Sequence, residues 1–244
     1  MKKSILFFTI FNLLIGCAVL SGCNLISNKQ VSNEPIDKEN NKPVVSEGSM
    51  KFKDEYESLN GIISEGKTNP YLELNIPEEN PIKYIGVEET MDLLDSGTGI
   101  LYLGFPECPW CRNLIPALIE SAQENRLTNI YYYNALEIRD KKHLDDNGEI
   151  VIDINGTPEY YQIVDKLKDY LGEYKGLNDP SIKRLYFPTT VFIKSGKIVG
   201  VNIGTIESHE DPTHNLTTEE TQELKSIINK YIEKVYSDTC KEDC

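Results

Sequence analysis

The side chains in this sequence that are best suited to chemistry are its cysteines, which occur as three closely spaced pairs. From the N-terminus, these pairs are Cys17 with Cys23, Cys108 with Cys111, and Cys240 with Cys244. Pairs at such short spacing favour redox or metal chemistry over a framework of structural disulfides. The sequence therefore predicts sulfur chemistry, and the surroundings of each pair indicate which kind.

The central pair, Cys108-Pro109-Trp110-Cys111, follows a hydrophobic run and opens a segment of helical pattern. Disulfide exchange needs a thiolate, and the unpaired N–H groups and dipole at a helix N-terminus stabilise one. Pro109 suits the first helical position because it has no N–H to leave unpaired. We therefore expect a lowered pKa for Cys108, and we expect Cys111, one turn further on, to attack a mixed disulfide on Cys108.

The neighbours of the pair have opposing effects. Arg112 would favour the thiolate of Cys108, whereas Glu107 would disfavour it, because their charges are opposite. Trp110 is the only tryptophan, and between two active cysteines it is expected to be exposed and to contact a substrate. The alternative is that Trp110 packs against a following loop.

From residue 82 to about residue 236 the chain resembles the thioredoxin superfamily, and three features carry the resemblance. They are the strand, Cys-x-x-Cys and helix; Pro116 within that helix; and Phe187-Pro188-Thr189 at the start of a strand, before a hairpin and a terminal helix. A proline inside a helix is costly unless it has a role. The resemblance implies an α/β fold with a central mixed sheet flanked by helices. It also implies that Pro188 is cis and faces the cysteines, and that Phe187 pairs its backbone with a bound substrate strand.

The sequence departs from thioredoxins proper at the motif itself. They carry Trp before the first cysteine and Gly-Pro between the pair, whereas here Glu107 precedes Cys108 and Pro-Trp lies between, closer to glutaredoxins. They also hold a buried acid six residues before the first cysteine as a proton relay, and Tyr102 occupies that offset here. Residues 105–111 are similar to bacterial thioredoxin-like proteins called bacteriocin transport accessory proteins, which supports the fold only. The motif leaves open whether the pair reduces, oxidises or isomerises.

The N-terminal 23 residues have the composition of a secretory signal: two lysines, an apolar run and small residues before a cysteine. The end of this segment resembles the lipobox of bacterial lipoproteins, which implies that Cys23 is lipidated; Cys17 is a second match with a shorter apolar run. A buried helix with an incidental cysteine is the alternative interpretation. Residues 24–50 are rich in Asn, Ser, Lys, Glu and Pro, and we expect them to be a disordered tether.

The formal net charge of −14 limits the classes of partner. Binding nucleic acid or an anionic lipid surface by charge requires clustered Lys and Arg, so neither is expected. After the signal, no segment of the sequence is long and apolar enough to cross a membrane. The folded part is therefore expected outside the cytoplasm, held to the cell membrane by its lipid, where disulfide chemistry is favoured.

Hydrophobic periodicity predicts one α/β domain over residues 51–239, followed by a tail at 240–244. Helices are expected at residues 50–60, 87–94, 109–125, 158–174 and 218–236, and strands at 71–76, 82–85, 99–105, 129–134, 187–194 and 197–203. The 158–174 helix should bury Tyr161, Val164, Leu167 and Leu171, and Thr218 should cap the last helix. A large insertion, residues 136–180, precedes Pro188. Within it, residues 145–149 predict a tight turn between two strands; a calcium loop is the alternative, but the full ligand spacing is absent.

The remaining candidate residues have simpler interpretations. Cys240 and Cys244 are expected to form a local disulfide; a resolving redox pair, or zinc bound jointly with the central cysteines, are alternatives. The three histidines, at positions 143, 209 and 214, lie in polar segments and are predicted to be solvated.

The function predicted from these features is thiol–disulfide exchange with protein substrates outside the cytoplasm, with Cys108 and Cys111 as the catalytic residues. Trp110, Phe187 and Pro188 are expected to contact the substrate. No cofactor and no metal are expected, and a membrane redox partner should renew the active pair. The alternatives are a non-catalytic accessory lipoprotein of a transport or secretion system and a zinc-binding module.

Overall fold

The computed structural model describes residues 45–237. The predictions for Cys17, Cys23, most of the tether, and the Cys240–Cys244 pair lie outside the described residues. Within residues 45–237, no helix is both long and apolar enough to span a membrane.

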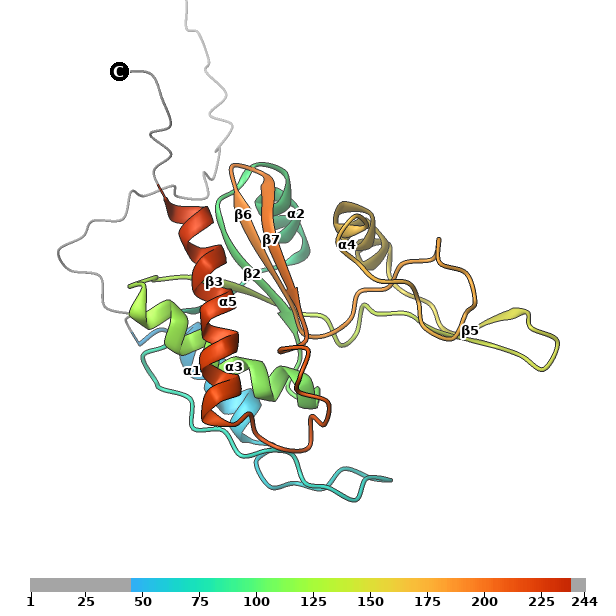
Figure 1. Cartoon of the computed structure of the whole chain (residues 1–244), viewed down its shortest axis with the longest axis horizontal. Helices are drawn as coiled ribbons and strands as arrows, with labels where there is room; N and C mark the ends of the chain where they lie inside the picture. Colours follow the sequence, from blue (N-terminus) through green and yellow to red (C-terminus); the bar gives the residue numbers. More distant parts are fainter. Residues whose placement is uncertain (1–44, 238–244) are drawn as a thin grey trace, which may run out of the picture. The chain divides into compact units, whose positions relative to one another are not determined.

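A mixed five-stranded sheet forms the centre of the fold, with strand order β1-β3-β2-β6-β7 (Figure 1). The parallel strands are β1 (Ile82–Tyr84), β3 (Ile130–Asn134) and β2 (Gly99–Gly104). Strands β6 (Thr189–Lys194) and β7 (Lys197–Ile203) continue the sheet in antiparallel pairing. All six residues of β2 are buried, because it lies in the middle of the sheet with helices on both faces.

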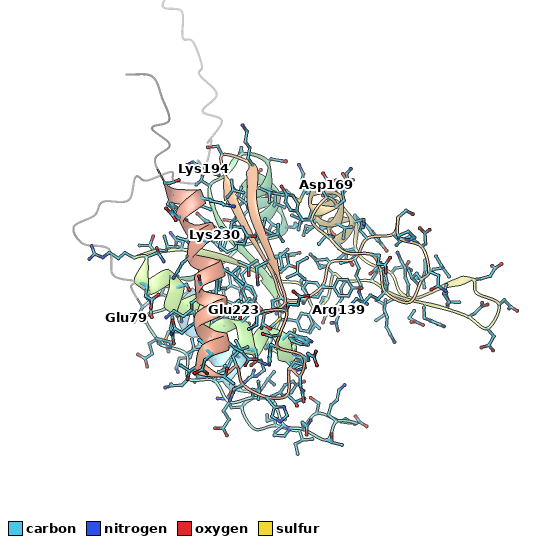
Figure 2. All side chains as sticks on the ribbon, viewed as in Figure 1. Glu79, Arg139, Asp169, Lys194, Glu223 and Lys230 are labelled. Atoms are coloured by element: carbon cyan, nitrogen blue, oxygen red, sulfur yellow. The ribbon has the colours of Figure 1, made fainter. Side chains whose placement is uncertain are left out.

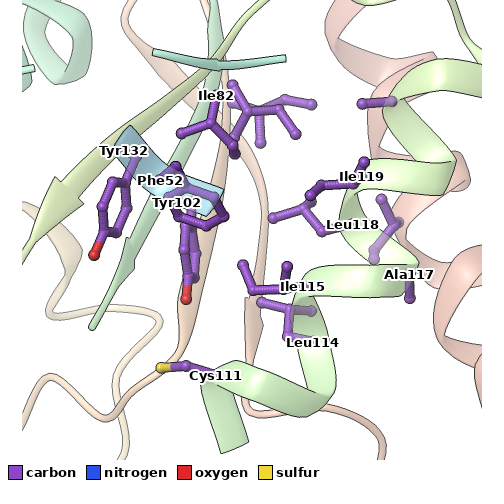
Figure 3. Packing of buried hydrophobic residues seen from close by; sticks show 14 of the residues in the cluster. Phe52, Ile82, Tyr102, Cys111, Leu114, Ile115, Ala117, Leu118, Ile119 and Tyr132 are labelled. Carbon is purple, nitrogen blue, oxygen red and sulfur yellow. The ribbon is translucent and has the colours of Figure 1, made fainter. Parts of the chain in front are cut away.

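Five helices cover the sheet, some on one face and some on the other. Successive side chains of β2 point to opposite faces and show which helices pack on each. Ile100 and Tyr102 pack with α1 (Glu47–Glu57), α3 (Pro109–Glu124) and α5 (Thr218–Tyr236). The side chains of Leu101 and Leu103 pack on the opposite face, with α2 (Val87–Ser96) and α4 (Pro158–Leu167). Figure 3 shows part of the first face, with α3 residues packed against those of the sheet. The predicted mixed α/β class, with a central sheet between helices, is confirmed.

Two short turns follow their sequence signatures. Ser195 and Gly196 both have positive φ, 49° and 71°, as a two-residue hairpin between β6 and β7 requires. A Cβ on Gly196 would lie 2.2 Å from the carbonyl oxygen of Asp95, so glycine is needed there for space as well. In the insertion, β4 (Lys141–Leu144) and β5 (Ile150–Ile154) form the predicted hairpin, and Asp145 Oδ1 accepts the N–H groups of its turn.

The predicted strand at 71–76 is wrong. Its alternating pattern reflects the burial of Leu74 and Ile76, but its backbone joins no sheet. The N–H of Leu74 instead donates to Asn60 Oδ1 over 2.9 Å, and the N–H of Ile76 donates to Glu57 Oε1 over 2.6 Å. Side chains at the end of α1 and just beyond it therefore take the place of a neighbouring strand.

The predicted helix at 158–174 is too long. Leu167 and Leu171 are buried as predicted, but Tyr160 and Ile163 are buried in place of Tyr161 and Val164. Helix α4 ends at Leu167, because Gly172 and Tyr174 pair their backbones with residues 182–184 instead of continuing the helix. The buried face consists of Tyr160, Ile163 and Leu167, while Tyr161 is exposed.

Two helix starts also differ from prediction. Helix α1 begins at Glu47 because Ser46 and Ser49 form a reciprocal capping box, so the last residues of the expected tether are helical. Helix α5 is capped by Thr217 rather than Thr218, and the Thr217 hydroxyl accepts the N–H of Glu220.

Candidate active site

The Cys-x-x-Cys motif occupies the junction between β2 and α3. Cys108 is the N-cap of α3, with extended backbone angles (φ −80°, ψ 115°), and Pro109 takes the first helical position as predicted. The Cys111 N–H donates to Cys108 Sγ over 3.2 Å, so the helix N-terminus points directly at this sulfur. Both thiols are free; Cys108 is 5% exposed and Cys111 is fully buried.

The peptide bond between Phe187 and Pro188 is cis, which confirms the prediction for Pro188. The Cys108 thiol donates to the carbonyl oxygen of Phe187 over 3.5 Å. The Phe187 ring meets the Phe105 ring edge-on at 5.3 Å between centroids. The start of β6 and the start of α3, far apart in sequence, thus form one site.

The two thiols have opposite pKa shifts. Burial raises the pKa of Cys108, but hydrogen bonds from Cys111 and from the backbone of Cys111 and Trp110, with the charge of Arg139, lower it below its ordinary value. Burial above all, with the Cys108 sulfur close by, raises the pKa of Cys111 well above its ordinary value. Cys108 is therefore the more readily ionised thiol of the pair, and Cys111 is held as a thiol.

Arg139 is a site residue that the sequence did not reveal. It lies in the segment between β3 and β4, and its guanidinium stacks over the Phe105 ring at 4.5 Å from the centroid. Its charge lowers the pKa of Cys108. No local pattern marks this arginine, because it reaches the motif only through the fold.

The sequence offered Arg112 and Glu107 as opposing charges beside Cys108, but Arg139 is the charged group that lowers the pKa of Cys108. Arg112 is fully buried, and its guanidinium donates hydrogen bonds to oxygens of the surrounding chain. The acceptors are the carbonyl oxygens of Tyr56, Leu72 and Pro106 and the side chain of Asn60. Arg112 thus joins the end of α1 and the following extended segment to the motif helix.

Two tyrosines lie behind Cys111. The hydroxyls of Tyr56 and Tyr102 share a 2.7 Å hydrogen bond, and both side chains are fully buried. The Tyr102 hydroxyl favours the Cys111 thiolate and so lowers the pKa of Cys111, against the larger opposing effect of burial. Figure 3 shows the Cys111 sulfur on the side of the sheet where the Tyr102 and Tyr132 hydroxyls lie. Burial holds the pKa of Tyr56 and Tyr102 well above the ordinary value, so they remain protonated and act as donors rather than bases.

Trp110 packs against a following loop, which is the alternative to full exposure. Its ring is half-buried and meets the ring of His209 edge-on at 5.3 Å. His209, predicted to be solvated, is buried instead, with Nδ1 3.0 Å from Thr205 Oγ1 and Nε2 3.2 Å from the carbonyl oxygen of His214. The prediction failed because the polar sequence of this loop does not show that the loop folds over the motif. His214 is exposed, as predicted.

Within the described part of the chain, no three or more His, Cys, Asp or Glu side chains form a group that could hold a metal ion. No protein-family model matches this chain, and no curated protein matches it either. What the chain does must therefore be inferred from the arrangement of its own residues.

Proposed function

We propose that this chain is a thiol–disulfide oxidoreductase with a thioredoxin-like fold, in which Cys108 exchanges disulfides with protein substrates and Cys111 resolves the intermediate. One observation carries the proposal: Cys108 caps a helix, with a lowered pKa, between the Cys111 N–H and the carbonyl oxygen that precedes a cis-proline. Pro116 within α3 further supports the fold. A structural cysteine would need neither a lowered pKa nor a second thiol within one helical turn.

In the reducing direction, the Cys108 thiolate attacks one sulfur of a substrate disulfide. A mixed disulfide forms, the substrate S–S bond breaks, and the first substrate sulfur leaves as a thiolate that takes a proton from water. Cys111 then loses its proton and attacks Cys108 Sγ, which breaks the mixed disulfide and releases the second substrate thiolate. The substrate gains two electrons and two protons, and Cys108 and Cys111 become a disulfide. Oxidation of a substrate dithiol is the reverse sequence.

Phe187, Pro188 and Trp110 surround the point of attack and are proposed to contact the substrate. The Phe187 carbonyl accepts from the Cys108 thiol in the reduced protein, so it becomes available to a substrate N–H once Cys108 is in a mixed disulfide. A substrate segment would then lie in extended form against the residues before β6.

The proposed setting is the outer face of the cell membrane, with the chain anchored through a lipid on Cys23. A membrane protein that exchanges thiols with Cys108 and Cys111 would return the pair to its working state, so the mechanism needs no bound cofactor. The acidic composition fits a domain that stands clear of anionic lipid.

Two substitutions in the full-length protein test the proposal. Cys108→Ser should abolish exchange with a disulfide-linked peptide, because the nucleophile is lost. Cys111→Ser should still attack but should accumulate mixed disulfides, seen as added mass that a reductant removes. Full exchange by Cys108→Ser, or no mixed disulfide on Cys111→Ser, would contradict the proposal.

An accessory protein that keeps the fold without catalysis is the second candidate. It is favoured by Tyr102, which stands where thioredoxins hold a buried acid, and by the large insertion before Pro188. The reduction potential of Cys108–Cys111 separates the two. An active pair should titrate in glutathione buffers between about −270 and −120 mV. A pair that stays oxidised throughout would support the accessory function.

A further inference from the structure

Strand β5 exposes an apolar edge. All five of its residues are exposed, and four are branched aliphatics: Ile150, Val151, Ile152 and Ile154 are 43%, 37%, 51% and 50% accessible. Among the described residues β5 pairs only with β4, so its other edge presents unpaired backbone groups. Edge strands with apolar side chains readily pair with another chain, and proteins normally protect them with charge or proline. The one charged residue of β5, Asp153, contacts His143 of β4 instead, with 3.0 Å between Oδ2 and Nδ1.

The base of this hairpin is firmly held. Asp140 is buried and its carboxylate lies 2.9 Å from the ammonium of Lys142. The Tyr174 hydroxyl accepts the N–H of Lys142 over 2.8 Å. These contacts fix the direction in which the hairpin leaves the domain, and Figure 1 shows β5 extending away from the central sheet. A flexible appendage would have no such contacts at its base.

The hairpin begins at the proposed active site. Arg139, whose charge acts on Cys108, stands two residues before the first residue of β4, and its guanidinium lies over Phe105. Phe105 in turn contacts Phe187, which adjoins the cis-proline. Figure 2 labels Arg139 between the central sheet and the projecting hairpin. The base of the hairpin that carries the apolar edge therefore adjoins the place where a substrate disulfide would react.

We propose that β5 binds an extended apolar segment of the protein whose disulfide is exchanged at Cys108. The segment would add as a strand to the free edge, with its backbone pairing to β5 and its side chains covering the isoleucines. This inference rests on the proposed function and names its substrate class: proteins that are not fully folded, which offer accessible cysteines beside extended apolar sequence.

Two observations favour such a segment over a second copy of this chain. The formal net charge of −14 makes two copies repel each other. A strand of five residues is also far smaller than the roughly 20–30 residues per side of a stable interface, whereas it suits a transient partner. The short contact would release its substrate after exchange.

The test uses two synthetic peptides of equal length, each with one cysteine linked to glutathione. One carries a Val-Ile-rich stretch a few residues from the cysteine, and the other carries Ser and Thr in that stretch. The full-length protein should show a lower KM for the apolar peptide. The variant Ile150→Thr/Ile152→Thr/Ile154→Thr should raise that KM about tenfold and leave kinetics with the polar peptide unchanged, because it removes apolar contact area but keeps strand-forming residues.

Ile63→Thr is the matched control, because Ile63 is 57% exposed and lies outside the insertion. It should leave the KM for both peptides unchanged. Circular dichroism and unfolding curves confirm that the triple variant folds, and anisotropy of a labelled cysteine-free apolar peptide measures binding without any redox step.

The outcomes separate the inference from the function on which it rests. Equal KM values for the two peptides, or equal losses in the triple variant and Ile63→Thr, would overturn the docking surface while exchange at Cys108 continues. A dimer in sedimentation that the triple variant dissociates would assign the edge to a second copy and also overturn it. Binding of the cysteine-free peptide by the Cys108→Ser protein, lost on the triple substitution, would support the surface whatever the redox activity.

Discussion

The hydroxyl pair behind Cys111 gives the sharpest test of how the site is built. Tyr56 comes from α1 and Tyr102 from β2, and their 2.7 Å hydrogen bond joins this helix to the central strand. Tyr102 also lowers the pKa of Cys111, so Tyr102→Phe affects both the fold and the chemistry. Tyr56→Phe removes the same bond from the other side and leaves the Tyr102 hydroxyl beside the thiol. The two substitutions are therefore matched controls for each other.

The expected loss of stability follows from the full burial of both hydroxyl groups. With one hydroxyl removed, the other is left without its partner away from water, which should lower the free energy of unfolding by about 1–3 kcal/mol. With both removed, no such group is left unpaired by the change. The double variant should then lose less than the sum of the single variants, by a coupling energy of about 1–2 kcal/mol. Urea unfolding of the reduced proteins measures all three values.

The Tyr102→Phe substitution should change the rate of only one step of the exchange reaction, the attack by Cys111. Reaction with a thionitrobenzoate disulfide releases one coloured thiolate when Cys108 attacks and a second when Cys111 resolves. Tyr102→Phe should slow the second release about tenfold, since it removes a donor to the developing thiolate, and leave the first unchanged. Tyr56→Phe should change neither release. Additive stability losses together with an unchanged second release would refute the role that we assign to this pair.

Three further predictions concern charge, structure and the Trp110 loop. Arg139→Gln should raise the pKa of Cys108, because a nearby positive charge favours the thiolate, and the pH midpoint of iodoacetamide alkylation should then move upward. Arg139→Lys keeps the charge and should restore part of the shift. An unchanged midpoint in Arg139→Gln would contradict this role. Arg112→Met should lower the free energy of unfolding by about 2–4 kcal/mol by leaving buried carbonyls unpaired, without moving that midpoint; a small loss would contradict its structural role. His209→Ala should shift Trp110 fluorescence to longer wavelength as its packing partner is lost, and unchanged emission would argue against that contact.

The parts of the site that could be predicted from sequence are those determined by local geometry. A cysteine before a proline at the end of a hydrophobic strand identifies a helix N-cap, and two intervening residues fix the relation of Cys108 to Cys111. The two-residue turn at Ser195 and Gly196 depends only on backbone preference. Strand β2 was predictable because a central strand is apolar on both faces. Each of these features depends on few residues, all close in sequence.

Features that depend on distant contacts could not be predicted. Arg112 adjoins Cys111 in sequence, yet burial turns it toward carbonyl oxygens, and Arg139 supplies the charge near Cys108 instead. His209 lies in a polar loop and gains its burial only because that loop covers Trp110. The alternating pattern at residues 71–76 indicates which side chains are buried. It does not indicate which groups accept the backbone N–H groups of these residues.

The insertion before Pro188 is better understood as part of the site than as an addition to it. It starts where Ala135 donates its N–H to the carbonyl of Gly104, at the end of the strand that leads to the motif. It supplies Arg139 within a few residues, and it returns to the site at Phe187, beside Cys108. A segment that supplies Arg139 near one end and meets Cys108 at the other could orient a substrate of the proposed reaction. This arrangement supports the proposal that exchange at Cys108 and recognition along β5 act on the same substrate.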